Sequence, residues 1–195
     1  MKLFIPIRTI ILIALLSGTG CGLNPVTAAL LGRQNPFTSD PEQIRIAVRM
    51  PNNLSVNTAN YGVDYKTDGK QHKHNWQMEV VSLRGTNKAQ VVGLGKFRKP
   101  GYHFEVARVK PSDLPELYRL QKTVPPPPRT RGSFQVGASP CYHGAMMPAR
   151  MPVELYIKTD KIGQFSVLSY ERDLLKDMKK HYTAKQLREE VPPCK

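Results

Sequence analysis

The sequence predicts a mainly β protein, folded as an antiparallel β-sandwich with short helices near 113–122 and 172–190. About eight short segments alternate apolar and polar residues and follow one another roughly every 8–15 residues, a spacing typical of sandwiches. Helical spacing of apolar residues is confined to two regions in the second half of the chain. The length of 195 residues suits one folded domain preceded by a short N-terminal region.

The first half of the chain carries five predicted strand regions. The clearest is 44–50, where apolar residues alternate with Arg45, Ala47 and Arg49. Further strands are predicted over 54–56 with 61–65, over 76–80, over 89–94 and over 102–106. Gly93 and Gly95 indicate a bulge or a close backbone approach at the end of the 89–94 strand. Turns are expected at 67–70 and 99–101.

The apolar spacing becomes helical after residue 112. Asp113 is predicted to cap a helix of two to three turns, with Glu116 at its third position. Four prolines at 125–128 end that helix and favour a polyproline II segment, either a stiff loop or a ligand for an aromatic groove. Strands follow over 134–138, 153–157 and 165–169, and a helix over 172–182. Thr183 and Gln186 have the spacing of a capping box for a last short helix.

The single tryptophan, Trp76, and most of the tyrosines and phenylalanines are expected to fill the core between the two sheets. The layout is similar to immunoglobulin-like envelope modules in general. The Cys…Trp…Cys spacing of true immunoglobulin domains is absent.

Residues 1–21 are organised like a secretory signal. A basic start with Lys2 and Arg8 precedes an apolar run over 9–16, and small residues over 17–20 lead to Cys21. A cysteine in this position resembles the lipobox of bacterial lipoproteins. The resemblance implies cleavage before Cys21, a diacylglyceryl group on its sulfur and a third acyl chain on its amine. Cleavage by the ordinary signal peptidase is the alternative, because Gly18 and Gly20 are small enough for that enzyme.

The predicted organisation is a signal peptide at 1–20, a lipid-anchored tether at 21–41 and a single sandwich domain at 42–195. The apolar run is much shorter than the roughly 20 residues that cross a bilayer as a helix. We therefore expect a protein of the cell envelope, held at the periplasmic face of a membrane through Cys21. Gly22 favours the outer membrane over the inner one if the source has two membranes.

The chain is strongly basic, with 29 Lys and Arg against 15 Asp and Glu and a formal net charge of +14. Cleavage before Cys21 would remove two basic residues, Lys2 and Arg8, and leave a net charge of +12 (27 basic against 15 acidic). Such a surface attracts phospholipid headgroups, acidic glycans, phosphate-rich polymers or acidic proteins. The only clusters evident in the sequence are small, such as 96–99. An exported protein is not expected to meet nucleic acid.

Cys141 and Cys194 are the only cysteines besides Cys21. Once Cys21 carries lipid, an even pair remains in an oxidising compartment, which predicts a disulfide. Two free thiols are the alternative.

The candidates for metal binding are His72 and His74. Alternate residues of a strand point the same way, so both imidazoles could reach one copper or zinc ion. The sequence contains none of the common hydrolase or phosphate-loop motifs. We therefore expect no catalysis and no cofactor. The functional hypothesis is a membrane-anchored binding or assembly module with a basic surface for an anionic envelope polymer or an acidic protein partner; the alternative is a periplasmic metal-binding protein that uses His72 and His74.

Overall fold

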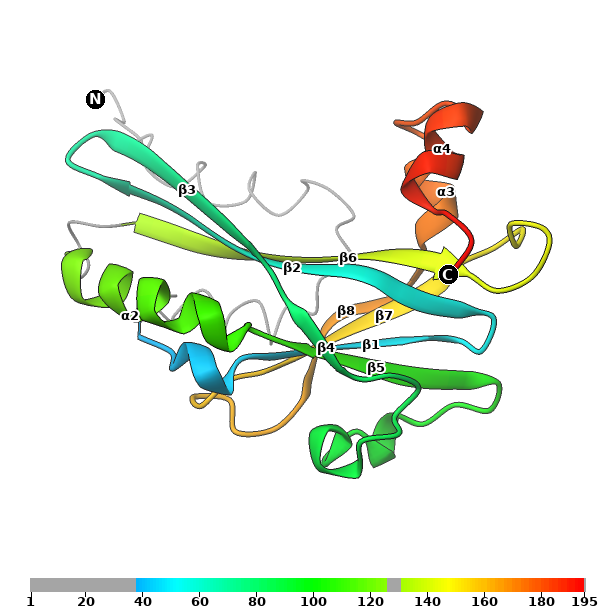
Figure 1. Cartoon of the computed structure of the whole chain (residues 1–195), viewed down its shortest axis with the longest axis horizontal. Coiled ribbons are helices and arrows are strands. Elements are labelled where there is room, and N and C mark those ends of the chain that lie inside the picture. Colours follow the sequence, from blue (N-terminus) through cyan, green and yellow to red (C-terminus); the bar gives the residue numbers. More distant parts are fainter. Residues whose placement is uncertain (1–37, 126–130, 195) are drawn as a thin grey trace, which may run out of the picture.

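The computed structural model describes residues 38–125 and 131–194 and shows a mainly β sandwich of two antiparallel sheets (Figure 1). The strands are β1 (Arg45–Pro51), β2 (Leu54–Thr67), β3 (Lys70–Gln77), β4 (Glu79–Ser82), β5 (Tyr102–Arg108), β6 (Arg131–Tyr142), β7 (Pro152–Lys158) and β8 (Ser166–Asp173). The α-helices are α2 (Leu114–Thr123), α3 (Leu174–Met178) and α4 (Ala184–Glu190), and the 3-10 helices are η1 (Pro41–Gln43), η2 (Lys88–Val91), η3 (Gly95–Phe97) and η4 (Pro111–Asp113).

The larger sheet has the order β4-β5-β1-β7-β8, and the smaller sheet has the order β3-β2-β6. All named strand pairs are antiparallel. The long strand β2 pairs along most of its length with both β3 and β6 and is the central strand of the smaller sheet. The prediction of an antiparallel sandwich with short helices near 113–122 and 172–190 is confirmed.

The main core lies between the two sheets and follows the alternation seen in the sequence. On β1, Ile46, Val48 and Met50 face this core, as expected for a period of two. Trp76 and Tyr61 contribute aromatic rings from the smaller sheet and are 8% and 2% exposed. The expected core role of the tryptophan is therefore confirmed.

A second, smaller core covers the outer face of the larger sheet. It joins buried residues of β1, β5 and β7 to Leu94 and Phe165, which come from loops. Tyr156 at its centre is fully buried, with the ring of Phe104 5.6 Å away. The larger sheet is consequently buried on both faces in its middle, unlike a sandwich sheet whose outer side is entirely solvated.

The helix ends follow the sequence signals in one case and not in the other. Thr183 and Gln186 form the predicted capping box of α4. Asp113 does not cap α2 through its side chain; a 3-10 turn, η4, leads directly into the helix instead. Glu116 of the first turn is used differently, since its Oε2 accepts a hydrogen bond from the Trp76 indole at 2.9 Å.

Two strand predictions need correction. Residues 89–94 are not a strand: η2 and a turn occupy them, and Gly93 adopts a positive φ of 89° that ends any extended run. Residues 76–80 are not one strand either. The chain leaves β3 after Gln77, and the Met78 N–H donates to Ala59 O at 2.7 Å before β4 joins the other sheet.

Residues 39 and 40, just before the predicted start of the domain at residue 42, contact helix α2. The Ser39 carbonyl accepts a hydrogen bond from Gln121 of α2, and the Asp40 carboxylate accepts one from the Tyr118 hydroxyl at 2.8 Å. Hydrogen bonding to Asp40 raises the pKa of Tyr118 to about 12. The predicted signal peptide, most of the tether and most of the proline run (126–128) lie outside the described residues.

Candidate anion-binding pocket

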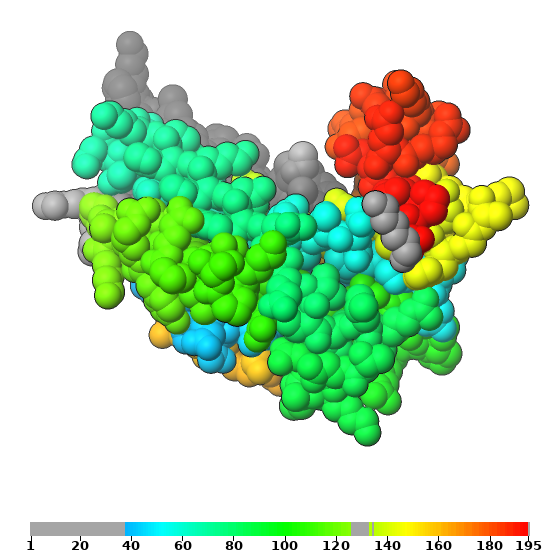
Figure 2. Space-filling model, viewed as in Figure 1, coloured from blue at the N-terminus to red at the C-terminus, as the bar shows by residue number. Residues whose placement is uncertain are grey.

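The segment between β4 and β5 is the most basic continuous stretch of the described chain. Residues 83–99 contain five Lys or Arg residues and no Asp or Glu. Figure 2 shows this part of the chain, in green, as a protrusion at the lower side of the molecule. We call residues 83–99 the basic loop.

Several contacts hold the basic loop against the outer face of the larger sheet. Leu94 is 1% exposed and belongs to the second core. The ring of Phe97 lies 4.7 Å from that of Tyr156, and the Phe97 carbonyl accepts a hydrogen bond from Arg49 Nη1 at 2.7 Å. Burial of one large aliphatic residue and one ring fixes the two short 3-10 helices, so the loop presents its charges from a defined position.

A turn at the start of the loop sets the direction of its first cation. The Thr86 N–H donates to the Leu83 carbonyl at 3.0 Å, and the two central residues, Arg84 and Gly85, have positive φ values of 51° and 69°. Glycine adopts this conformation freely, whereas arginine does so at a cost of the order of 1 kcal/mol. The Arg84 side chain is exposed.

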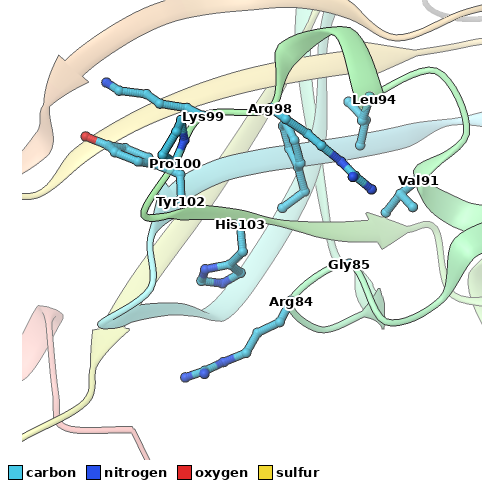
Figure 3. A pocket seen from close by; sticks show the side chains of 11 residues that line it. Arg84, Gly85, Val91, Leu94, Arg98, Lys99, Pro100, Tyr102 and His103 are labelled. Carbon is cyan, nitrogen blue, oxygen red and sulfur yellow. The ribbon is translucent and has the colours of Figure 1, made fainter.

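A pocket of about 460 Å³ lies between the basic loop and β5 (Figure 3). The strand β4 pairs with β5 only at Val106–Arg108, so the first half of β5 has an edge that β4 does not cover, and the pocket follows this edge. The lining consists of Arg84, Gly85, Val91, Leu94, Gly95, Arg98, Lys99, Pro100, Tyr102, His103 and Phe104.

The lining is cationic and contains no carboxylate. Figure 3 shows the Arg98 guanidinium reaching back towards Val91, while Arg84 and His103 lie on the other side of the β5 ribbon. Among the described residues, Arg84 and Arg98 have no ion-pair partner. The two guanidinium groups lie on opposite sides of the β5 ribbon in Figure 3 and do not converge, but both add positive charge to the lining of the pocket.

Lys99 is the one cation of the lining with a close acidic neighbour. Its Nζ lies 2.7 Å from Glu171 Oε2 and 4.3 Å from the centre of the Tyr102 ring. The hydrogen bond to Glu171 raises the pKa of Lys99. Lys99 therefore stays charged throughout the physiological range. Glu171 also lies 3.5 Å from Arg49, so its charge is shared between two cations.

His103 brings a buried polar group to the pocket. Its side chain is 8% exposed, and Nε2 lies 3.3 Å from the carboxylate of Glu105, which faces the inter-sheet core. The other ring nitrogen, Nδ1, is buried and has no hydrogen-bond partner within the described part of the chain. A buried polar atom without a partner is uncommon in folded proteins and is often satisfied by a ligand or water.

This arrangement is suited to binding an anionic group. Guanidinium groups and a lysine favour oxyanions such as phosphate, which accept several charge-assisted hydrogen bonds. The side chains can hold and orient an anionic group.

The two histidines predicted as metal ligands lie on the same face of β3, as the alternation requires, but they stack with aromatic residues. The Tyr65 ring is 4.8 Å from that of His72 and 6.0 Å from that of His74, and Trp76 lies 5.6 Å beyond His74. Glu116 is 3.9 Å from His74 Nδ1. Within residues 38–125 and 131–194, no three His, Cys, Asp or Glu residues gather as a metal site would require. Metal binding remains a prediction from the sequence.

The predicted covalent sites are the lipid attachment at Cys21 and the disulfide between Cys141 and Cys194. Cys21 lies outside the described residues. Cys141 and Cys194 lie at disulfide distance, with Cα atoms 5.0 Å apart, and the tail is held beside β6 by a hydrogen bond from Cys194 N to Tyr142 O. Over the described ranges, no helix is both long and apolar enough to cross a bilayer.

Sequence reasoning identified only the 96–99 part of the basic cluster. Arg84 and His103 were not recognised as members of one site. A usable signal was present, because five cations and no acid fall within 17 consecutive residues.

Comparisons with family models, with curated proteins and with solved structures gave no match, so function has to be argued from the geometry of this chain alone.

Proposed function

We propose that this protein is a membrane-anchored envelope lipoprotein whose sandwich domain is a non-catalytic binding module for anionic groups. The observation that carries the proposal is the pocket beside β5, where Arg84 and Arg98 are unpaired and the lining has no carboxylate. A phosphate-bearing or carboxylate-bearing envelope component would supply the missing charge.

The anchor part of the proposal rests on the resemblance of residues 17–21 to a lipobox. Three acyl chains on Cys21 would fix the chain to a leaflet without any transmembrane helix. In an oxidising envelope, the pair Cys141–Cys194 would form a disulfide, consistent with the short distance between the two residues.

The anchor can be tested by the intact mass of protein extracted from the membranes of the producing cell. A mass equal to residues 21–195 plus three acyl chains, less two hydrogens, is expected. An unacylated mass that begins at another residue would refute the anchor.

Anion binding can be tested with the processed protein and inorganic polyphosphate, followed by titration calorimetry at low and high salt. Replacing both Arg84 and Arg98 by Glu should weaken binding more than tenfold and flatten its salt dependence. The matched control changes Arg119 and Lys122 of α2 to Glu, which alters the net charge equally at a remote exposed surface. Equal losses in both variants would show that binding depends on net charge and would refute the pocket.

A further inference from the structure

We propose that the basic loop is a membrane-docking element: its pocket receives the phosphate of an anionic phospholipid headgroup, and Leu83 and Val92 enter the interfacial layer of the bilayer. This inference rests on the proposed function, because it names the anionic component that the pocket binds. It goes beyond the proposed function in two respects: the partner is the bilayer surface, and the aliphatic residues Leu83 and Val92 contact it in addition to the pocket.

Two aliphatic side chains of the basic loop are exposed to solvent. Leu83 and Val92 are 56% and 69% exposed, and they belong to a small group of large hydrophobic residues in that state within the described chain. Both lie on the basic loop. Exposed aliphatic residues within a segment rich in cations are typical of interfacial membrane contact, where apolar side chains enter the headgroup layer and cations remain above it.

The backbone explains why Val92 points outward. Val91 lines the pocket, whereas Val92 lies at the connection between η2 and η3. The next residue, Gly93, has a φ of 89°, so the chain turns sharply there. Leu94 then returns to the second core and is 1% exposed. Val92 is therefore presented at the tip of an anchored turn rather than folded back onto the sheet.

The charge of the same segment matches an anionic bilayer. Besides Arg84 and Arg98, the basic loop carries Lys88, Lys96 and Lys99, with no acid among its 17 residues. Each basic residue close to an anionic membrane surface strengthens association by about fivefold. An acidic protein would also satisfy the charge; the proposed lipid anchor favours the bilayer, because it would keep the basic loop close to a leaflet.

With the proposed lipid anchor, even a weak contact between the basic loop and the bilayer is enough for docking. The 16 residues between Cys21 and Thr38 can span at most roughly 60 Å, so the domain would remain close to the leaflet that holds its acyl chains. Docking of the basic loop is then an intramolecular step with a high effective concentration of headgroups. Electrostatic docking of this kind responds to the fraction of anionic lipid and to salt.

The test places a single environment-sensitive dye on the loop tip. In the processed protein, Cys21 carries lipid and the other two cysteines are oxidised, so Val92→Cys provides one reactive thiol for an NBD label. The labelled protein is reconstituted into vesicles of phosphatidylcholine and into vesicles that also contain phosphatidylglycerol. We expect the emission to shift to shorter wavelength and rise about 2–5-fold only in the anionic vesicles. Added salt should reverse the change.

Two controls separate docking from nonspecific effects. Met146→Cys carries the same dye at a residue 83% exposed on the loop after β6, which Figure 1 places away from η2 and η3. Its emission should not respond to anionic lipid. Leu83→Cys is a second reporter on the basic loop and should respond as Val92→Cys does, which guards against a local effect of one substitution.

The outcomes distinguish this inference from the proposed function. Iodide in the aqueous phase quenches the dye only where the dye is in water. If iodide still quenches the Val92 dye in anionic vesicles, docking is refuted. The anion pocket survives that result as long as polyphosphate binding still depends on Arg84 and Arg98. If polyphosphate does not bind and anionic lipid does not change the emission of the Val92 dye, both proposals are refuted. A lipid response that the Arg84→Glu and Arg98→Glu changes abolish supports both.

Discussion

Removing the carboxylate of Glu105 perturbs the polar link between the two sheets. Glu105 is 1% exposed, and its Oε2 accepts a hydrogen bond from the Val56 N–H at 2.7 Å. Oε1 lies 3.3 Å from His103 Nε2. The strand β2 is irregular between Val56 and Thr58, and Val56 stands opposite Pro140 of β6 in the register. The carboxylate thus pairs with a backbone donor at a place where the ladder is interrupted.

The magnitude follows from the number of groups left without partners. In Glu105→Ala, the Val56 N–H and the His103 ring each lose an acceptor, at about 1–3 kcal/mol for each buried group. We expect the free energy of unfolding to fall by about 3–5 kcal/mol, a large part of the roughly 5–15 kcal/mol typical of a domain.

Glu105→Gln is the matched control, because the amide retains an oxygen that can accept from Val56. It should cost only about 1 kcal/mol. The assay is urea unfolding under oxidising conditions, followed by the fluorescence of the single tryptophan, Trp76, which is buried in the core. A loss below about 1 kcal/mol for Glu105→Ala, or equal losses for both variants, would refute the hydrogen-bond reasoning.

Two further predictions concern the C-terminal part of the chain. Burial alone would raise the pKa of the Asp173 carboxyl, but hydrogen bonds from the Met151 and Lys176 N–H groups and from Arg150 hold that pKa below its ordinary value of 3.8. Stability from a depressed pKa is present above the unfolded value and lost as pH falls through the folded one, so Asp173→Ala should cost about 1–2 kcal/mol at pH 7 and progressively less below about pH 4 in a urea series. Replacing Cys141 and Cys194 together by Ala should lower the free energy of unfolding by about 4 kcal/mol, given a sequence separation of 53. Reductant should produce the same loss in the parent protein and none in the variant; a parent unaffected by reductant would contradict the prediction.

The elements that sequence reasoning predicted correctly are those in which apolar and polar residues alternate along a strand or capping residues stand at a fixed spacing. On β1, Ile46 and Val48 face the main core while Arg45 and Arg49 flank the outer face, so the alternation is strong. The capping box at Thr183 could also be predicted, because its hydrogen bonds join residues only three positions apart. In both cases the information lies within a few consecutive residues.

The errors occur where distant packing decides the structure. The 89–94 segment reads as extended, yet the chain forms a short 3-10 helix over Lys88–Val91, with Val91 packed against the second core and Leu94 buried in it. The break after Gln77 depends on a hydrogen bond to Ala59, which no local pattern reveals. The pocket could not be predicted for the same reason, since Arg84 and His103 come to line one pocket only after the chain folds back along β5.

The link between Cys141 and Cys194 would also govern how the molecule carries a pulling force. The tail runs beside the end of β6 in a bridge between Tyr142 and Pro193, so β7, β8, α3 and α4 all lie inside the closed ring. A load applied between an anchored N-terminus and the last residue would pass across the ring and leave those elements unloaded. Stretching the oxidised chain would therefore hide about 180 Å of contour length, at roughly 3.5 Å per residue over a separation of 53, until the sulfur bridge is reduced.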